Sequence, residues 1–179
     1  ILKKFKLEIF DVEELSVHGG SLRLYIKKIG QIKKENSNLK KILNKEKEFG
    51  ITKKETYRNF QNQILEKKIS IWKFFSVAKK EKKKIACYGA PAKGNTMLNY
   101  CQIGKDFINF TVDKNPAKQG KLLPGTHIPI FNLKKINEFK PDYLVILPWN
   151  LKEEIVEEMK YIRKWGGKFV VLSPKVKIF

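Results

Sequence analysis

The chain has 179 residues, a net charge of +20, 42% hydrophobic residues and two cysteines. This length allows one ordinary core with an appendage, and no apolar run is long enough to cross a bilayer, so we expect a soluble protein without a membrane partner. Lysines interrupt the first apolar residues, unlike a signal peptide, and Cys87 and Cys101 lack the spacing of metal ligands. We therefore expect free thiols, no metal site and a cytoplasmic location.

Most of the positive charge lies in the middle of the chain. Residues 29–84 hold 17 Lys and Arg against 6 Asp and Glu. Apolar residues recur there at helical spacing, and the lysines occupy the remaining positions, as on a solvated helix face. Only three residues of the whole chain are arginine, which is the side chain suited to bidentate contacts with phosphates and bases. We therefore expect no nucleic-acid partner.

The predicted elements fall into three stretches. Residues 5–28 predict a β-hairpin, in which FKLEIFDVEEL and SLRLYIKK are joined by the turn SVHGG. Residues 31–82 predict two helices with a break near Gly50. From Lys83 onward, helical stretches alternate with the apolar runs KIACY, FINFTV, IPIF, DYLVIL and KFVVL. The predicted fold class is α/β, with a mostly parallel sheet flanked by helices and preceded by a hairpin and a two-helix connector.

The segment YGAPAKGNT, residues 88–96, predicts the end of a buried strand, then a glycine turn and the start of a helix. After the first strand of an open α/β sheet, backbone N–H groups at the helix N-terminus face the ligand crevice and favour an anion. A phosphate would fit there. Gly89 and Gly94 would allow close backbone approach, Lys93 would add charge, and Asn95 and Thr96 would donate hydrogen bonds.

Two well-known nucleotide motifs match this segment only in part. The spacing approaches a P-loop, but Asn95 stands where that motif needs a lysine, which argues against an NTPase. The segment is not G-x-G-x-x-G, although Asp113 follows the second strand, where dinucleotide folds place an acidic residue on the ribose hydroxyls. Spacing alone leaves two interpretations open: a ligand loop, or a structural turn in which the glycines serve tight backbone geometry and helix packing.

A second candidate segment is LPWN, residues 147–150, at the end of a later buried strand. Parallel strands deliver their ends to one edge of a sheet, so this segment should lie beside Gly89, where Trp149 would stack on a base. For Asn150 the sequence favours a helix N-cap with Glu153 as its partner.

The two histidines complete the candidates drawn from residue types. His127 is expected on a loop neighbouring those of Asp113 and Lys118, and a structural role is favoured for such an isolated histidine. His18 lies in the turn HGGS between the two strands of the hairpin, which suits the rim of an active site and a plain hairpin equally. No carboxylate or nucleophile partner is visible beside His18, so residue types alone do not establish general-base chemistry.

Five long strings are FDVEELSVHGGSLRLYI, YGAPAKGNTMLNYC, VDKNPAKQGKLLPGTHIPIF, PDYLVILPWNLKEEI and YIRKWGGKFVV. Together they resemble the carboxy-terminal part of the bacterial S-adenosylmethionine-dependent sugar C-methyltransferases, over almost the whole chain. Members of that family carry an amino-terminal zinc-binding region, a central methyl-donor domain and a carboxy-terminal Rossmann-like domain. The last domain helps to hold a nucleotide-linked keto-deoxysugar, commonly a thymidine diphosphate sugar. The reaction methylates a ring carbon next to a ketone through an enolate-like intermediate.

The resemblance implies roles for the candidate residues. It implies a diphosphate cradle made of Gly89, Ala90, Lys93, Gly94, Asn95 and Thr96. It implies that Asp113 and Trp149 lie near the sugar or base, and that His127 and Asn150, from the strings GTHIP and PWN, belong with the substrate-binding residues. His18 is the implied catalytic residue.

The chain also departs from the family's pattern, because it has no cysteine cluster for zinc and no glycine-rich methyl-donor motif ahead of the helical connector. The resemblance therefore implies a fragment that begins at Ile1 by truncation or processing. Residues 1–28 would be a strand pair of the methyl-donor domain, residues 29–82 a helical connector, and residues 83–179 the Rossmann-like nucleotide-sugar-binding domain. The upstream domain would bind S-adenosylmethionine and the amino-terminal region zinc, so we expect part of a methyltransferase that is inactive alone.

Two other functions remain open on the sequence. One is a stand-alone Rossmann-like nucleotide-binding module, regulatory or redox, for which affinity for NAD would be the discriminating observation. The other is a structural or assembly role for the basic helices and the sheet, favoured if no nucleotide binds. The free strand edges of residues 5–28 would also allow two copies to pair as a homo-oligomer.

Overall fold

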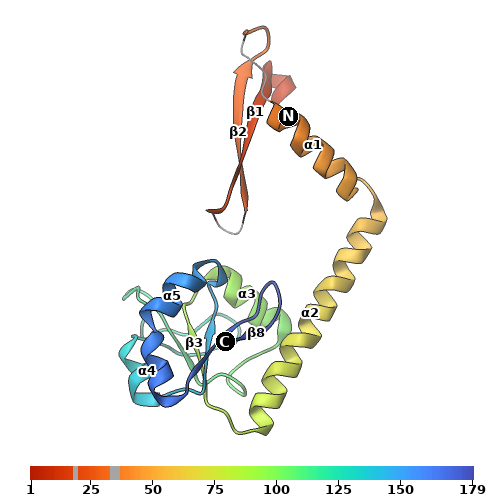
Figure 1. Ribbon diagram of the computed structural model, residues 1–179. Coiled ribbons are helices and arrows are strands. Elements are labelled where there is room, and N and C mark those ends of the chain that lie inside the picture. The colour runs from red at the N-terminus through yellow and green to blue at the C-terminus, as the bar shows by residue number, and fades with distance from the viewer. Residues whose placement is uncertain (18–19, 33–36) are drawn as a thin grey trace. The chain divides into compact units, whose positions relative to one another are not determined.

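The computed structural model describes residues 1–17, 20–32 and 37–179, which divide into two units, Ile1–Gln63 and Ile64–Phe179. Figure 1 shows the elements of each unit. Among the described helices, none combines the length and the apolarity that crossing a bilayer requires.

The first unit contains a hairpin and a helix. After a short 3-10 helix η1 (Leu2–Phe5), β1 (Leu7–Leu15) pairs antiparallel with β2 (Ser21–Lys28), which confirms the predicted hairpin. α1 (Ser37–Phe49) packs against β1. Lys45 of α1 forms an ion pair with Glu14, and Val12 of β1 is buried. His18, the predicted catalytic residue of the turn, lies outside the described residues.

The predicted break near Gly50 is confirmed. α1 ends at Phe49, Gly50 has a φ of +75°, and α2 (Lys54–Lys80) begins after a short turn. α2 crosses the limit between the two units. Its second half is part of the core of the second unit, because Ile71 and Phe75 are among its buried side chains.

The second unit is built on a six-stranded sheet. Its strands are β3 (Ile85–Tyr88), β4 (Phe110–Val112), β5 (Ile130–Phe131), β6 (Tyr143–Ile146), β7 (Lys168–Val171) and β8 (Lys177–Ile178). The strand order is β5-β4-β3-β6-β7-β8. Every neighbouring pair is parallel except β7 and β8, which are antiparallel. All five apolar runs named from the sequence thus form strands.

Helices cover both faces of this sheet. α2 and α3 (Ala92–Cys101) pack on one face. On the other lie α4 (Lys134–Phe139), η3 (Trp149–Leu151), α5 (Lys152–Glu158) and η4 (Lys160–Trp165). Alternation along β3 shows the two layers, because Cys87 belongs to the α2–α3 core and Tyr88 to the α4–α5 core. The predicted α/β fold with a mostly parallel, Rossmann-like sheet is confirmed.

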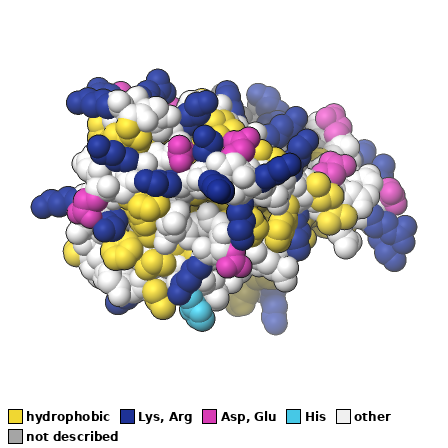
Figure 2. All heavy atoms as spheres, turned by 90° about the horizontal axis from the view of Figure 1, so that it is seen from below, with side chains coloured by type: hydrophobic (Ala, Val, Ile, Leu, Met, Phe, Trp, Pro, Cys, Tyr) yellow, Lys and Arg dark blue, Asp and Glu magenta, His cyan; other side chains and the backbone are white. Residues whose placement is uncertain are grey.

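Both cysteines are free and buried. Burial raises the pKa of the Cys87 thiol and of the Cys101 thiol, so both stay protonated at neutral pH. Positive charge, in contrast, lies on the surface: Figure 2 shows Lys and Arg side chains spread over the face it presents, with acidic and hydrophobic side chains between them.

Candidate functional site

The strand order predicts a ligand crevice at the carboxyl ends of β3 and β6. β4 and β5 lie on one side of β3, whereas β6 and β7 lie on the other, so the strand order reverses between β3 and β6. Open α/β sheets bind ligands at such a reversal. A cavity of about 240 Å³ lies there, between the turn after β3, the loop after β4 and the start of α5. Its lining includes Gly89, Ala90, Asp113, Lys114, Lys118, Pro148 and Glu154.

Two glycines bring the backbone close together at this crevice. Gly89 has a φ of +87°, and a Cβ atom on it would lie 2.8 Å from Cδ of Pro148. A Cβ atom on Gly94 would lie 2.7 Å from Cβ of Leu147, so α3 packs tightly against the end of β6. The structural interpretation of both glycines therefore holds, and the close approach that they permit is also what shapes the crevice.

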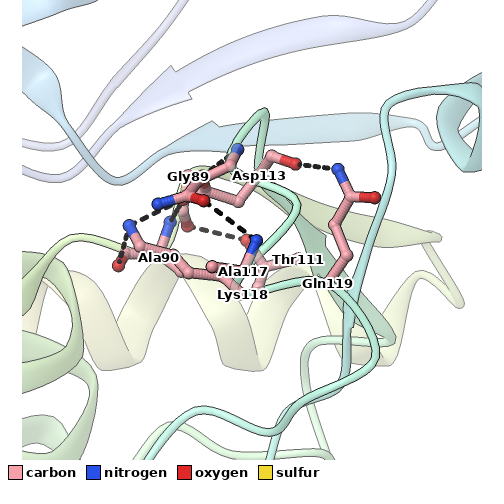
Figure 3. A network of polar contacts seen from close by, with 8 residues as sticks. Gly89, Ala90, Thr111, Asp113, Ala117, Lys118 and Gln119 are labelled. Atoms are coloured by element: carbon pink, nitrogen blue, oxygen red, sulfur yellow. Dashed lines mark hydrogen bonds and ion pairs between the residues drawn. The ribbon is translucent and has the colours of Figure 1, made fainter.

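Asp113 joins the turn after β3 to the loop after β4, as Figure 3 shows. Its Oδ2 atom accepts hydrogen bonds from the backbone N–H of Ala90 at 2.7 Å and from Nζ of Lys118 at 3.1 Å. Its Oδ1 atom accepts from the backbone N–H of Asn115 at 2.9 Å. Lys118 also donates to the Ala90 carbonyl at 3.1 Å. Spacing alone did not reveal this clamp, which uses three of about four lone-pair sites of the carboxylate.

The clamp keeps Asp113 ionised. Burial alone would raise the pKa of its carboxyl group, but the N–H groups of Asn115 and Ala90, together with the Lys118 ammonium, hold that pKa below its usual value. The carboxylate is therefore negatively charged at neutral pH, at the wall of the crevice.

The peptide groups of Gly89 are bonded to β4 as well. The Gly89 N–H donates to the Val112 carbonyl at 2.6 Å, and the buried Thr111 hydroxyl donates to the Gly89 carbonyl at 2.8 Å. Nε2 of Gln119 donates to the Asp113 carbonyl at 2.9 Å, which fixes the same loop from its far end (Figure 3). A ligand anion would therefore find its backbone donors in the first turn of α3, where N–H groups have no acceptor within the helix.

Three predicted residues meet beside the start of α3. Nζ of Lys93 lies 4.7 Å from the ring centroid of Trp149 and donates a hydrogen bond to Oδ1 of Asn150. The N-cap interpretation of Asn150 is wrong, since Leu151 is the N-cap of α5. The Leu151 N–H bonds to the Pro148 carbonyl at 2.8 Å, so a 3-10 turn precedes α5 and its start lies beyond Asn150.

Asn95 and Thr96 lie on α3, where their side chains bond to the helix itself. The Thr96 hydroxyl donates to the Ala92 carbonyl at 3.0 Å, and Oδ1 of Asn95 accepts from Nδ2 of Asn99 at 3.3 Å. Thr96 also lines a hollow between α2 and α3. Of the predicted cradle, Gly89 and Ala90 line the crevice cavity, while Lys93 lies beside it on Trp149.

His127 lies near the amino-terminal ends of the strands, whereas Asp113 lies at their carboxyl ends, so the expectation of neighbouring loops is wrong. Asp113 follows β4, whereas His127 precedes β5, and the two strands are parallel with Thr111 opposite Ile130. The loop after β4 is long enough to run back along β5, where the Gly120 N–H bonds to the Ile130 carbonyl. His127 lines a separate hollow near the end of α3.

Sequence reasoning missed a second polar cluster at the crevice. Oε2 of Glu158 accepts from the Tyr88 hydroxyl at 2.8 Å and pairs with Nζ of Lys114 at 2.9 Å. Burial, and next the hydrogen bond to Glu158, raise the pKa of Tyr88, so its hydroxyl stays a donor at neutral pH. The available signal was that Tyr88 and Lys114 each adjoin a residue already singled out, Gly89 and Asp113.

In the part of the chain that the structure describes, no three His, Cys, Asp or Glu side chains lie close enough together to hold a metal ion. The polar groups at the crevice include two lysines, Lys114 and Lys118, which form ion pairs with Glu158 and Asp113.

Comparison with known proteins adds the family. A relative, the C-methyltransferase NovU of Streptomyces niveus, is 32% identical over 172 residues, which cover 96% of this chain and 41% of NovU. This chain thus spans less than half the length of that relative. A solved structure, UDP-D-quinovosamine 4-dehydrogenase from Vibrio fischeri, is 19% identical with a TM-score of 0.38, covering 50% of this chain and 76% of that one. Residues 16–174 match the family model of the C-methyltransferase C-terminal domain, and the chain therefore belongs to that family, as its five strings predicted.

Proposed function

We propose that this chain is the substrate-binding part of an S-adenosylmethionine-dependent C-methyltransferase. In this proposal, the crevice between the ends of β3 and β6 holds the diphosphate of a nucleotide-linked keto-deoxysugar. The observation that carries the proposal is the cavity itself, since it lies where the strand order reverses and is lined by Lys114 and Lys118. Membership of the C-methyltransferase family supports the reaction class.

The chemistry of the crevice suits a sugar diphosphate. The first turn of α3 offers N–H groups and the positive end of a helix dipole to the phosphates. Lys118 and Lys114 are partly exposed, so they can contact an anion without leaving Asp113 and Glu158. Glu154 also lines the cavity and would accept hydrogen bonds from sugar hydroxyls. Asp113 serves mainly as the clamp that fixes the turn, and Trp149 would offer its ring to the base.

The methyl donor belongs elsewhere in this proposal. S-Adenosylmethionine carries a sulfonium cation, and the two carboxylates that line the crevice cavity, Asp113 and Glu154, are matched there by Lys114 and Lys118. The lining therefore has no excess of negative charge that would favour this cation. We infer that another part of the protein binds it, and that this chain alone does not transfer methyl groups; turnover by the chain with S-adenosylmethionine and a keto-sugar nucleotide would contradict this.

Calorimetric titration tests the substrate site. Thymidine diphosphate, NAD and S-adenosylmethionine would be added separately to the 179-residue chain at one salt concentration, and we expect thymidine diphosphate to bind most tightly. Lys114→Met and Lys118→Met should each weaken it by about tenfold. Lys105→Met is the matched control, because Lys105 lines the hollow at the opposite edge of the sheet. Equal weakening by the control would contradict the proposal.

A second variant separates the phosphates from the rest of the ligand. Lys93→Ala should weaken a nucleoside diphosphate more than the free nucleoside, and equal effects would count against a phosphate role for Lys93. If the wild-type chain binds NAD preferentially, a stand-alone nucleotide-binding module is favoured instead. If it binds none of the three ligands, a structural role is favoured.

A further inference from the structure

A surface on α2 and α3, away from the crevice cavity, contains two adjoining hollows. One, of about 340 Å³, is lined by Lys68 and Ile71 of α2 and by Met97 and Tyr100 of α3. The other, of about 420 Å³, runs along α2 past Leu65, Ile69 and Trp72, and it shares Lys68 with the first. We call this surface, from residue 64 to residue 76 of α2 with the facing side of α3, the α2–α3 strip.

The strip is apolar although it faces solvent. Leu65, Ile69 and Tyr100 are each more than half exposed. Leu65 and Ile69 lie four residues apart on one face of α2, and the row continues at Trp72, which itself packs partly on the core and donates to the Cys101 carbonyl. The core-forming residues of the same helix, such as Ile71 and Phe75, belong to a different face. α2 therefore has a second apolar face, which is typical of a helix that packs against another element.

The charged side chains that line the two hollows are of one sign, although Glu66 also belongs to this stretch of α2. Lysines 67, 68, 73 and 93 line the two hollows. Of the residues that the structure describes, no Asp or Glu lines either hollow, whereas the cavity at the crevice includes Asp113 and Glu154. Nζ of Lys68 lies 5.1 Å from the ring centroid of Tyr100, at the point where the two hollows meet. An acidic partner would complement this rim.

The dimensions favour a helical segment as the occupant. Residues 64–76 of α2 extend over roughly 18 Å at the helical rise per residue, which is about three turns of a partner helix. A second copy of the chain is disfavoured, because each copy carries a net charge of +20 and a two-fold contact would bring the lysine rims together.

We propose that the α2–α3 strip docks an amphipathic helix with acidic flanks, supplied by a partner polypeptide. Apolar side chains of that helix, spaced three and four residues apart, would enter the two hollows, while its Asp and Glu residues pair with the lysine rim. The two surfaces share Lys93, which lines the first hollow and lies on Trp149 beside the crevice. Leu65, Lys68 and Ile69, which the experiments below change, do not line the crevice cavity.

A peptide-display selection tests the proposal directly. A library of helical peptides of about 14 residues would be selected on the 179-residue chain and counter-selected on the double variant Leu65→Ser, Ile69→Ser, whose changes fall on exposed positions. We expect the enriched peptides to have apolar residues at the three-and-four spacing and a net negative charge. Failure to enrich any peptide over the double variant, or enrichment of neutral or basic peptides, would overturn the proposal.

Titration of one selected peptide then locates the contact. Lys68→Glu should weaken its binding by about tenfold, whereas Lys79→Glu and Val77→Ser, on the same helix but outside the two hollows, should leave it unchanged. If all three variants weaken binding of the peptide equally, the peptide does not bind in the two hollows and the proposal is overturned. Sedimentation measurements provide a last check, because a dimer that the double variant abolishes would show that a second copy, rather than an acidic helix, covers the strip.

Discussion

Gly94 leaves almost no space between α3 and the end of β6. A methyl group on it would lie 2.7 Å from Cβ of Leu147 and 3.2 Å from Cγ of Pro91. Overpacking of this kind costs about 1–3 kcal/mol, while alanine in a helix regains up to about 1 kcal/mol over glycine. We therefore expect Gly94→Ala to lower the free energy of unfolding by about 1–2 kcal/mol, measured by urea denaturation.

The control for this substitution is Gly104→Ala. A Cβ atom on Gly104 would have its nearest neighbour at 3.9 Å, an ordinary contact. If Gly104→Ala lowered the free energy of unfolding as much as Gly94→Ala, crowding between α3 and β6 would not be the cause of the loss.

The carboxylate of Asp113 links stability to pH. Since its pKa is lower in the folded chain than in the unfolded one, ionisation contributes stability above the unfolded pKa, about 3.9, and that stability is lost as the pH falls through the folded pKa. Asp113→Asn should lower the free energy of unfolding by about 2 kcal/mol at pH 7, because charge-assisted hydrogen bonds are weakened. The difference between wild type and variant should shrink below about pH 4.

Urea denaturation at a series of pH values checks this prediction, with Asp106→Asn, on an exposed loop, as the reference variant. If the free energies of unfolding of wild type and Asp113→Asn differ by the same amount down to the lowest pH, ionisation of Asp113 is not what stabilises the clamp.

At the scale of single elements, α2 has two halves with different surroundings. Phe75, in the second half, is fully buried against the sheet, whereas Phe60, in the first half, is 56% exposed. Phe75→Ala should therefore destabilise the chain by about 3–5 kcal/mol, and Phe60→Ala by well under 1 kcal/mol. Thermal and urea unfolding of the two variants provide the measurement, and similar losses would mean that the first half is packed too.

The elements were largely predictable from the sequence because each depends on local pattern. Continuous apolar runs such as YLVI and FVV are typical of strands buried on both faces, and they form β6 and β7. The end of a helix near Gly50 follows from a single residue.

The contacts of the site were less predictable because they depend on distant parts of the chain. Lys118 meets the Ala90 carbonyl across 28 residues, and Tyr88 meets Glu158 across 70. Asn150 has the residue type and spacing of an N-cap, but the turn at Pro148 moves the start of the helix. The edge of the sheet at which His127 lies is decided by the path of the loop after β4, which residue types do not specify.

At the scale of the whole molecule, the two units differ in how much apolar surface they bury. Within the described residues of Ile1–Gln63, Val12 is the sole buried hydrophobic side chain, whereas the second unit has apolar cores on both faces of its sheet. Regions with few buried contacts open at a low free-energy cost. We expect the amides of β1 and β2 to exchange hydrogen well before those of β3, β6 and β7.

Hydrogen exchange followed by mass spectrometry of the whole chain would measure this difference. Protection of the hairpin as strong as that of β3 would show that it is stabilised by contacts beyond its own unit.

The continuity of α2 determines where the chain can be shortened to prepare the sheet unit by itself. The limit between the units falls between Gln63 and Ile64, inside a helix that runs from Lys54 to Lys80. A shortened chain beginning at Ile64 would open with uncapped N–H groups inside that helix and would lose almost three of its turns. Expression from residue 50 onward keeps the helix whole, so the cleavage point for preparing the sheet unit by itself is the turn at residues 50–53, ten residues before the apparent boundary.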